Sequence, residues 1–254
     1  MLLAIDIGNT NITLGIFKEE RLITDWRIFT EKEKTTDEYG ISILNLFNFS
    51  KLNPAKIKAI IISSVVPPLT PVFSEMSRKY FKVKPLIVEP GIKTGISIQY
   101  DSPHEVGADR IVNGVAAFNK YRGPCIVVDF GTATTFDAIS DKGEYLGGAI
   151  APGIHISAEA LFQKTAKLPR VEIKKPKRVI GRTTVSSLQS GLYFGYIGLI
   201  KNIILEMKKE LGPKTKVIST GGFSAEMTKE IKLIHCHDPY LTLEGLRIIY
   251  ERNK

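Results

Sequence analysis

Two short segments of the sequence each place an aspartate after an apolar run and follow it with glycine and polar residues. The first is Asp6-Ile7-Gly8-Asn9-Thr10, and the second is Asp129-Phe130-Gly131-Thr132-Ala133-Thr134-Thr135. Glycine lets the backbone turn tightly beside a phosphate, and Asn and Thr side chains add hydrogen-bond donors. Two such loops could hold a polyphosphate from both sides. Carboxylates beside phosphates require a cation between them, because like charges repel. The alternative is that each aspartate only caps a turn.

A third acidic residue, Asp109, precedes Arg110 at the expected start of a helix. Asp109 could accept a hydroxyl proton while Arg110 holds an anionic group of the acceptor. The adjacent arginine should lower the pKa of the Asp109 carboxyl and make it a weak base. Phosphoryl transfer tolerates a weak base, because positioning and charge neutralisation dominate the reaction. The alternative is a helix-terminal acid that the helix dipole favours.

The sequence lacks the common motifs of other nucleotide and metal sites. It contains no G-x-x-x-x-G-K-[ST], since Gly91-Ile92-Lys93-Thr94 lacks the upstream glycine, and no G-x-G-x-x-G follows a strand. His235-Cys236-His237 resembles a metal-binding triplet, but no fourth ligand is evident. We therefore interpret that triplet as part of a structural strand.

The elements expected to position these residues occur twice in the same order. In the first half the predicted strands are residues 2–7, 12–17, 22–29 and 59–66, with a helix signal at Thr36-Asp37. In the second half the corresponding predicted strands are residues 125–128, 136–139 and 145–148. Asp6 and Asp129 are separated by 123 residues, close to half of the chain. This repetition predicts an internal duplication, with the ligand between the halves at the carboxyl ends of their first strands.

The other predicted elements complete each half. They are a helix from about 106–110 to 121, a helix at 154–162, a long helix at about 185–211, strands at 216–219 and 233–236, and a terminal helix from Leu241. Gly191 and Gly195 form a small-residue notch on the long helix. Such a notch fits close packing against another backbone, either inside the monomer or across a dimer.

The composition excludes several classes of protein. The 254 residues are 43% hydrophobic and 24% charged, as in ordinary globular proteins, and no run approaches the roughly 20 apolar residues of a membrane span. The N-terminus places Asp6 where a signal peptide would be apolar, so we expect no export. Only two cysteines are present, which suits a reducing cytoplasm. The net charge of +9 comes largely from short basic runs without aromatic residues, so we expect a solvated surface and no nucleic-acid partner.

Several motifs together make the chain similar to a known family. They are Asp6 to Thr10, Gly107-Ala108-Asp109-Arg110, Asp129 to Thr135, Gly147-Gly148-Ala149-Ile150-Ala151-Pro152-Gly153 and Thr220-Gly221-Gly222. With these motifs in this order, the chain resembles type III pantothenate kinase, of the acetate and sugar kinase, Hsp70 and actin superfamily. Ser102 and Thr183 stand where that family usually has Asn.

The resemblance implies an α/β, duplicated ribonuclease H-like (actin-like ATPase) fold with two domains and a cleft between them. The expected domains are residues 1–117 and 118–254, and the terminal helix at about 241–254 could pack back on the first domain. The implied activity is ATP-dependent phosphorylation of pantothenate to 4'-phosphopantothenate, the first step of coenzyme A biosynthesis.

The resemblance also implies a role for individual residues. The implied ATP-binding residues are Asp6, Ile7, Gly8, Asn9, Thr10, Asn11, Ile12, Thr13 and Thr132. The implied substrate-binding residues are Tyr100, Gly107, Ala108, Asp109, Arg110 and Thr184. Asp109 would accept the proton, Asp129 would bind the K+ or NH4+ ion that the family requires, and Mg2+ would accompany the nucleotide. Thr184 would reach the substrate of the neighbouring subunit, which makes a homodimer the catalytic unit.

Two other functions stay open on sequence grounds. The first is a non-catalytic transcriptional accessory protein on the same fold, against which the intact Asp6, Asp109, Arg110 and Asp129 argue. The second is an enzyme of the same superfamily with a changed reaction, either a kinase for another small hydroxy acid or a phosphatase. Pocket shape decides the acceptor, and the sequence does not reveal it.

Overall fold

The computed structural model describes residues 1–254, which divide into two compact units. Unit 1 comprises Met1–Asn119 together with Tyr240–Lys254, and unit 2 comprises Lys120–Pro239. The C-terminal segment therefore belongs to the same unit as the N-terminus. No helix in either unit combines the length and the apolar character that crossing a bilayer requires.

Unit 1 is built on a five-stranded sheet in the order β3-β2-β1-β4-β5. Its strands are β1 (Leu2–Ile7), β2 (Asn11–Lys18), β3 (Arg21–Phe29), β4 (Ala59–Ser64) and β5 (Leu86–Ile87). Its other elements are α1 (Thr36–Phe49), α2 (Leu69–Phe81), α3 (Ala108–Tyr121), α7 (Leu241–Asn253), the short strand β6 (Ser97–Ile98) and the 3-10 turns Pro54–Lys56 and Pro103–Glu105. Strands β1, β2 and β3 pair antiparallel, whereas β4 and β5 run parallel to β1.

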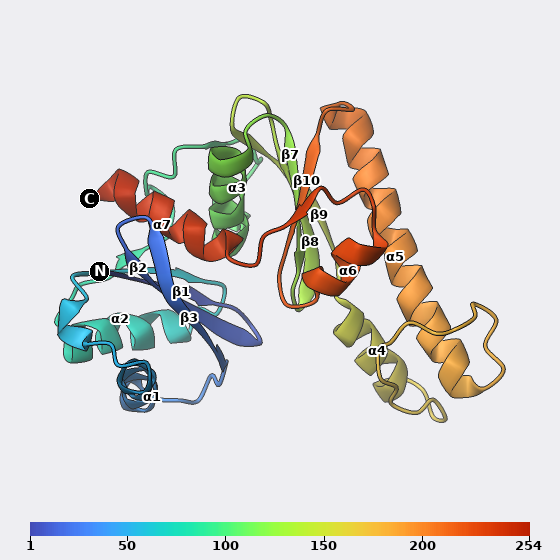
Figure 1. Cartoon of the computed structure of the whole chain (residues 1–254), viewed down its shortest axis with the longest axis horizontal. Coiled ribbons are helices and arrows are strands. Elements are labelled where there is room, and N and C mark those ends of the chain that lie inside the picture. The colour runs from blue at the N-terminus through green and yellow to red at the C-terminus, as the bar shows by residue number, and fades with distance from the viewer. The chain divides into compact units, whose positions relative to one another are not determined.

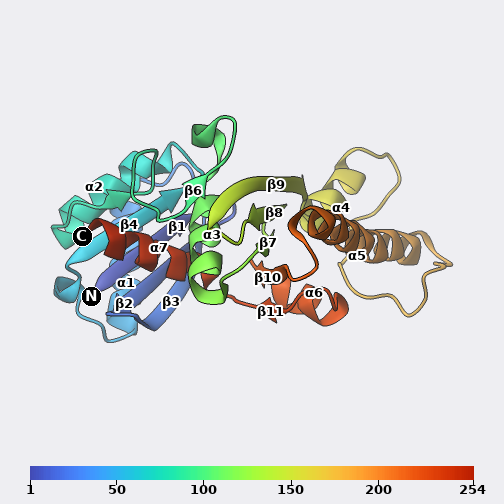
Figure 2. The same cartoon turned by 90° about the horizontal axis from the view of Figure 1, so that it is seen from above.

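Alternation along β1 buries both faces of this sheet. Leu3 and Ile5 belong to the core cluster shared with α1 and α2, and Leu2 and Ala4 belong to the cluster shared with α3 and α7. These two pairs of helices cover opposite faces of the sheet (Figures 1 and 2). Complete burial of such side chains stabilises the fold by roughly 1.5–3 kcal/mol each relative to exposure. Helix α7 contacts β1, β2 and β4, so the end of the chain closes the core formed by its beginning.

Unit 2 repeats the same sheet. Its strands run in the order β9-β8-β7-β10-β11, with antiparallel pairing among β7, β8 and β9 and parallel pairing of β10 and β11 to β7. They are β7 (Cys125–Phe130), β8 (Ala133–Ile139), β9 (Glu144–Pro152), β10 (Lys216–Thr220) and β11 (Cys236–His237). Because strand order and direction match those of unit 1, the predicted duplication is confirmed. Each unit has the ribonuclease H-like topology.

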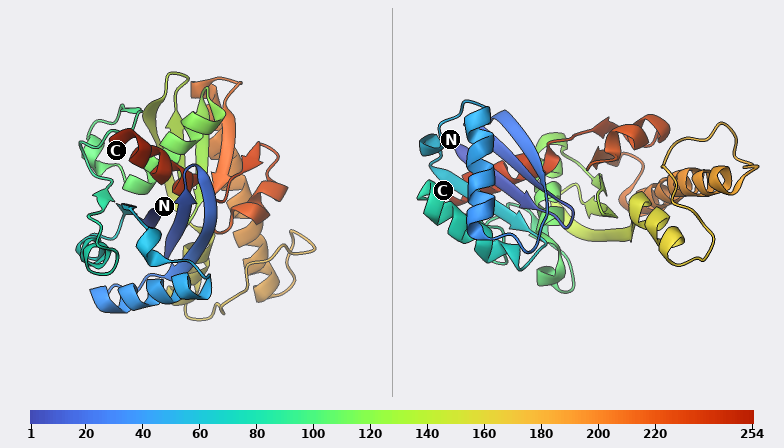
Figure 3. Two further views of the ribbon diagram at one scale, coloured as in Figure 1. Left: turned by 60° about the vertical axis from the view of Figure 1, so that its left-hand side comes forward. Right: turned by 90° about the horizontal axis from the view of Figure 1, so that it is seen from below.

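Three helices complete unit 2. They are α4 (Ile154–Gln163), α5 (Thr184–Leu211) and α6 (Ser224–Glu230). Helix α5 packs on the sheet through Tyr196, Ile200 and Ile204, and α4 lies beside it (Figure 3). Thr183 caps the start of α5, since its hydroxyl accepts the Ser186 N–H. Threonine and asparagine are both favourable N-cap residues. The helix therefore still begins here, although Thr183 stands where the family usually has Asn.

The structure differs from the predicted elements in several places, and α2, α6, β5 and β6 were not predicted. Strand β4 ends at Ser64 and not at residue 66, because the Ser64 hydroxyl turns back to accept the Val66 N–H at 3.2 Å. The last short strand is β11 and not residues 233–236, because a turn from Ile231 to Ile234 precedes it. Helix α2 was not predicted, although Leu69, Phe73 and Met76 recur at helical spacing and are fully buried.

Candidate functional site

In unit 1, one row of paired residues crosses the sheet at the carboxyl end of β1. Asp6 pairs with Thr13 of β2 on one side and with Ser63 of β4 on the other. Thr13 pairs in turn with Arg27 of β3. Directly paired residues point to the same face of a sheet, so all four side chains lie on one face. The result is a polar row beside the apolar core.

The duplicated row in unit 2 starts from Asp129. Asp129 pairs with Thr135 of β8 and with Thr220 of β10, and Thr135 pairs with Ile150 of β9. Both aspartates are the penultimate residues of their strands. Two carboxylates in equivalent settings argue against the alternative of isolated turn caps.

Burial sets the ionisation of Asp6. Removal of the carboxylate from water is the main cause and the negative charge of Asp109 the second, and the pKa of Asp6 is raised from 3.8 to about 7. The Ser63 hydroxyl donates to Asp6 Oδ1 and the Arg27 charge favours ionisation, but both effects are smaller. A cation bound beside this carboxyl group would favour its ionised form and lower its raised pKa.

The loop between β1 and β2 is fixed by its own backbone and by Thr30. Gly8 N–H donates to the Asn11 carbonyl at 3.0 Å. The Thr30 hydroxyl donates to the Gly8 carbonyl at 2.7 Å, and Thr30 N–H donates to the Thr10 carbonyl at 2.9 Å. Asn9, Thr10 and Asn11 are exposed around this rigid turn. Ile7 and Ile12 are fully buried, so a nucleotide could meet only their main chain.

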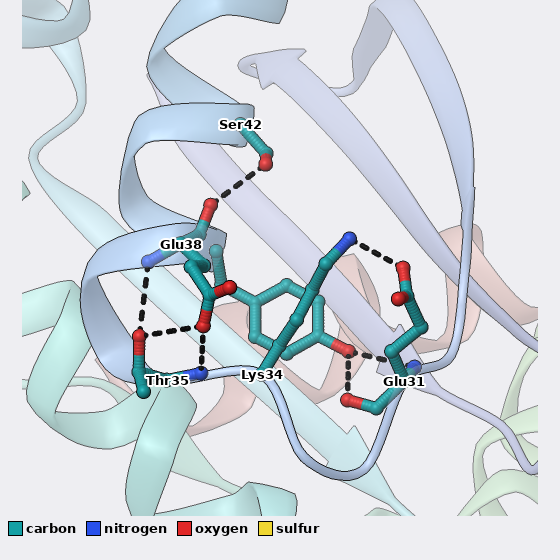
Figure 4. A network of polar contacts seen from close by, with 6 residues as sticks. Glu31, Lys34, Thr35, Glu38 and Ser42 are labelled. Atoms are coloured by element: carbon teal, nitrogen blue, oxygen red, sulfur yellow. Dashed lines mark hydrogen bonds and ion pairs between the residues drawn. The ribbon is translucent and has the colours of Figure 1, made fainter.

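The segment after Thr30 is anchored to the core through Tyr39. The Tyr39 hydroxyl donates to the Glu31 carbonyl at 2.8 Å and accepts the Glu31 N–H at 3.0 Å. Figure 4 shows these contacts beside the Thr35–Glu38 capping box, which starts α1. The Tyr39 ring packs on Phe73 at a centroid distance of 4.6 Å. The β3–α1 connection therefore holds Thr30 in place.

Asp109 lies in the first turn of α3 and accepts the Arg110 N–H at 2.8 Å. Its pKa is raised, because burial outweighs the favourable charge and N–H of Arg110. The expectation of a weak base is therefore wrong: the arginine does lower the pKa, but loss of water dominates. Gly107 lies against this carboxylate, since a Cβ there would fall 2.6 Å from Asp109 Oδ1. The Arg110 side chain is 7% exposed.

Glycines shape the corresponding region of unit 2. A Cβ on Gly221 would fall 2.4 Å from Asp129 Oδ1, and Gly221 has a φ of +92°. A Cβ on Gly153 would fall 2.3 Å from the Thr132 carbonyl oxygen and 2.8 Å from that of Gly131. Only glycine permits these approaches. The Asp129 carboxylate and the exposed Thr132 loop thus lie where backbone comes unusually close.

The remaining predicted residues lie on other elements. Tyr100 is half-buried after β6, and Ala108 is the first residue of α3. Thr184 is exposed in the first turn of α5 and lines an open groove of about 700 Å³. His235 Nδ1 accepts the Val217 N–H at 2.9 Å, which is a structural contact. No group of three or more His, Cys, Asp or Glu side chains is arranged so that it could hold a metal ion.

Sequence reasoning missed two residues that shape the unit 1 site, Ser63 and Thr30. Ser63 carried a usable signal, because it is a polar residue within an otherwise apolar buried strand. Thr30 carried none, since its contact with Gly8 joins positions 22 residues apart and depends on the β2–β3 register.

Comparisons with known proteins agree with this arrangement. The family model described as type III pantothenate kinase matches residues 2–206. A relative named type III pantothenate kinase from Geobacter sulfurreducens is 59% identical, and the alignment covers all of both chains. A relative of the same name from Myxococcus xanthus is 55% identical over all of this chain and 99% of the other.

Solved structures share the fold at low identity. A putative Baf family transcriptional activator from Campylobacter jejuni has a TM-score of 0.62 and 22% identity, covering 99% of this chain and 98% of the other. A putative N-acetylglucosamine kinase from Porphyromonas gingivalis has a TM-score of 0.53 and 11% identity, covering 100% and 99%. The family match and the full-length relatives lead to one conclusion. The chain belongs to the type III pantothenate kinase family, whose members phosphorylate pantothenate in coenzyme A biosynthesis.

Proposed function

We propose that this chain phosphorylates pantothenate with Asp109 as the acceptor of the hydroxyl proton and Asp6 as the anchor of the nucleotide. The observation that supports this division is the electrostatic coupling of the two carboxylates within unit 1: the charge of Asp109 acts on Asp6. Burial raises the pKa of both carboxyl groups. The charge of Asp109 is the second largest cause of the raised pKa of Asp6, whereas Asp6 is not among the causes for Asp109. A nucleotide held at Asp6 then has its terminal phosphate near the base.

The proposed nucleotide site consists of residues 6–13 and Thr132. The turn at Gly8 presents backbone and side-chain donors to phosphate oxygens, and Thr132 offers the equivalent group from unit 2. The reluctant ionisation of Asp6 fits a magnesium ion, which is usually held by one or two carboxylates together with substrate phosphates. When bound, such an ion neutralises the charge of the phosphates.

The acceptor site is proposed at Gly107 to Arg110 and Tyr100. Arg110 would hold the carboxylate of pantothenate, since guanidinium and carboxylate groups form strong paired hydrogen bonds. The raised pKa of Asp109 makes it a better proton acceptor than an exposed aspartate. During transfer, the bond between the terminal phosphorus and the bridging oxygen of ATP breaks. A bond to the hydroxyl oxygen forms, and Asp109 takes the proton.

Asp129 is the proposed ligand of a potassium or ammonium ion. Gly221 lets its backbone approach Asp129 Oδ1 closely, since a Cβ there would fall 2.4 Å from that oxygen. A carboxylate with backbone packed closely beside it fits a monovalent cation that prefers oxygen ligands. The ion would supply positive charge close to the phosphates.

We further propose a homodimer in which Thr184 reaches the partner's substrate. A Cβ on Gly191 or Gly195 would meet nothing within 4 Å, so the alternative that this notch packs inside the monomer is wrong. The groove beside Thr184 continues along this open side of α5, since Gly191 also lines it. Mixing Asp109→Asn with Thr184→Ala protein should restore up to about a quarter of normal activity, because each mixed dimer has one intact site. No recovery from mixed dimers would contradict a shared site.

The activity itself is tested by incubating the protein with magnesium ATP and pantothenate in potassium and again in sodium, with phosphopantothenate detected directly. Product formed faster in potassium supports both the acceptor and the cation. Equal rates in both salts would remove the cation proposal alone. No product in either salt would favour another acceptor or a regulatory role. The two free cysteines lead us to infer a reducing, cytoplasmic setting.

A further inference from the structure

Ser63 and Arg27 are the two positions of the unit 1 polar row to which the family resemblance assigns no role, and Ser63 already donates a hydrogen bond to Asp6, which leaves Arg27. Arg27 pairs with Thr13, which pairs with Asp6, so Arg27 and Asp6 share a face two strands apart. Adjacent strands lie about 4.8 Å apart, which places their Cα atoms about 10 Å from each other. The long Arg27 side chain can reach a group bound beside Asp6 across that gap.

The surroundings of Arg27 leave its charge available. The side chain is exposed, and no ion pair ties it to a carboxylate. Its positive charge nevertheless acts on Asp6. The row therefore contains a carboxylate at one position and a free guanidinium at another, with Thr13 between them. That spacing suits a phosphate chain lying between the two groups, with the Arg27 guanidinium on the side opposite the Asp6 carboxylate.

The duplication provides an internal comparison. The residue of unit 2 at the place of Arg27 is Ile150, which lies 123 residues later and pairs with Thr135 as Arg27 pairs with Thr13. Ile150 is 65% exposed. The strand topology that both units share therefore does not by itself require an arginine at this place. The two halves share the aspartate and differ in the cation.

From this arrangement we propose that Arg27 is a phosphate-binding residue that contacts the triphosphate of ATP and stabilises the charge of the phosphoryl group during transfer. This inference rests on the proposed function of the unit 1 site. A guanidinium presents several N–H donors in a planar fork that matches phosphate oxygens. Stabilising charge on the transferred group is the main task of side chains in phosphoryl transfer.

Arg27→Gln tests the proposal, with Arg21→Gln as the matched control. Arg21 is an exposed arginine on the same strand, about 20 Å from Arg27 at the usual rise per residue. We expect Arg27→Gln to lower kcat/KM for ATP roughly 10- to 100-fold, the range of a hydrogen bond to a charged group. The KM for pantothenate should stay within about twofold, and Arg27→Lys should recover only part of the loss.

Binding of mant-ATP with magnesium, measured by fluorescence without pantothenate, separates this proposal from the proposed function. Weaker mant-ATP binding by Arg27→Gln than by Arg21→Gln would support the phosphate contact even if pantothenate were not the acceptor. Two results would overturn it. One is equal behaviour of the two variants in ATP kinetics and mant-ATP binding. The other is a loss confined to the KM for pantothenate, which would place Arg27 at the acceptor.

Discussion

The ionisation of Asp6 makes the stability of the unliganded protein depend on pH. Its pKa is about 7 in the folded chain and near 3.8 when the side chain is solvated. Well below pH 3.8 the carboxyl is protonated in both states and has no differential effect. As the pH rises from 4 to 7 the unfolded chain gains more from ionisation, so the folded state loses stability. At 1.36 kcal/mol per pKa unit, the full loss is roughly 4 kcal/mol.

Asp6→Asn removes this loss. The amide cannot ionise, and its oxygen can still accept the Ser63 hydroxyl hydrogen bond. We therefore expect the variant to be more stable than the natural chain at pH 8 by up to about 4 kcal/mol, and to match it near pH 4. The same change should abolish phosphoryl transfer, because the proposed nucleotide anchor has lost its charge. Stability would then rise as activity disappears.

Urea unfolding between pH 4 and pH 8, followed by tryptophan fluorescence, measures the effect. Trp26 is the single tryptophan and packs on Phe47 in the unit 1 core at a centroid distance of 5.2 Å, so it reports on the unit that contains Asp6. Asp25→Asn, an exposed carboxylate on β3, is the control. Parallel pH dependences for the natural chain and Asp6→Asn, within about 1 kcal/mol, would refute the reasoning.

Three other changes probe the remaining parts of the site. Asp109→Asn should lower turnover roughly 10²–10⁴-fold and leave mant-ATP binding nearly intact, and near-normal turnover would reduce Asp109 to a helix-terminal acid. Asp129→Asn should remove stimulation by potassium, measured as the ratio of rates in potassium and sodium; an unchanged ratio would place the ion elsewhere. Gly153→Ala should displace the Thr132 loop, because its Cβ would meet a carbonyl oxygen at 2.3 Å. We expect a higher KM for ATP and a loss of about 1–3 kcal/mol in unfolding free energy, and normal values of both would contradict this close approach.

Much of the architecture was readable from the sequence because it is local. Apolar runs ending in Asp-x-Gly, repeated 123 residues apart, predicted two equivalent strand meanders, and both are present. The helix starting before Asp109 was also predictable, since its apolar spacing and acidic first turn are local signals. Helix α2 carried the same kind of signal in Leu69, Phe73 and Met76 and was missed beside Pro67-Pro68.

By itself, the sequence determined the residue types of the site, the duplicated order of strands and the resemblance that the family comparisons confirm. The tertiary structure decided how these residues act. The pKa of Asp109 is raised and not lowered, because burial is a property of the packed fold and outweighs the neighbouring arginine. Ser63, Thr30 and Arg27 gained their relation to Asp6 or its loop only through strand pairing between distant segments. Local spacing specifies elements, whereas desolvation and register arise only when those elements meet.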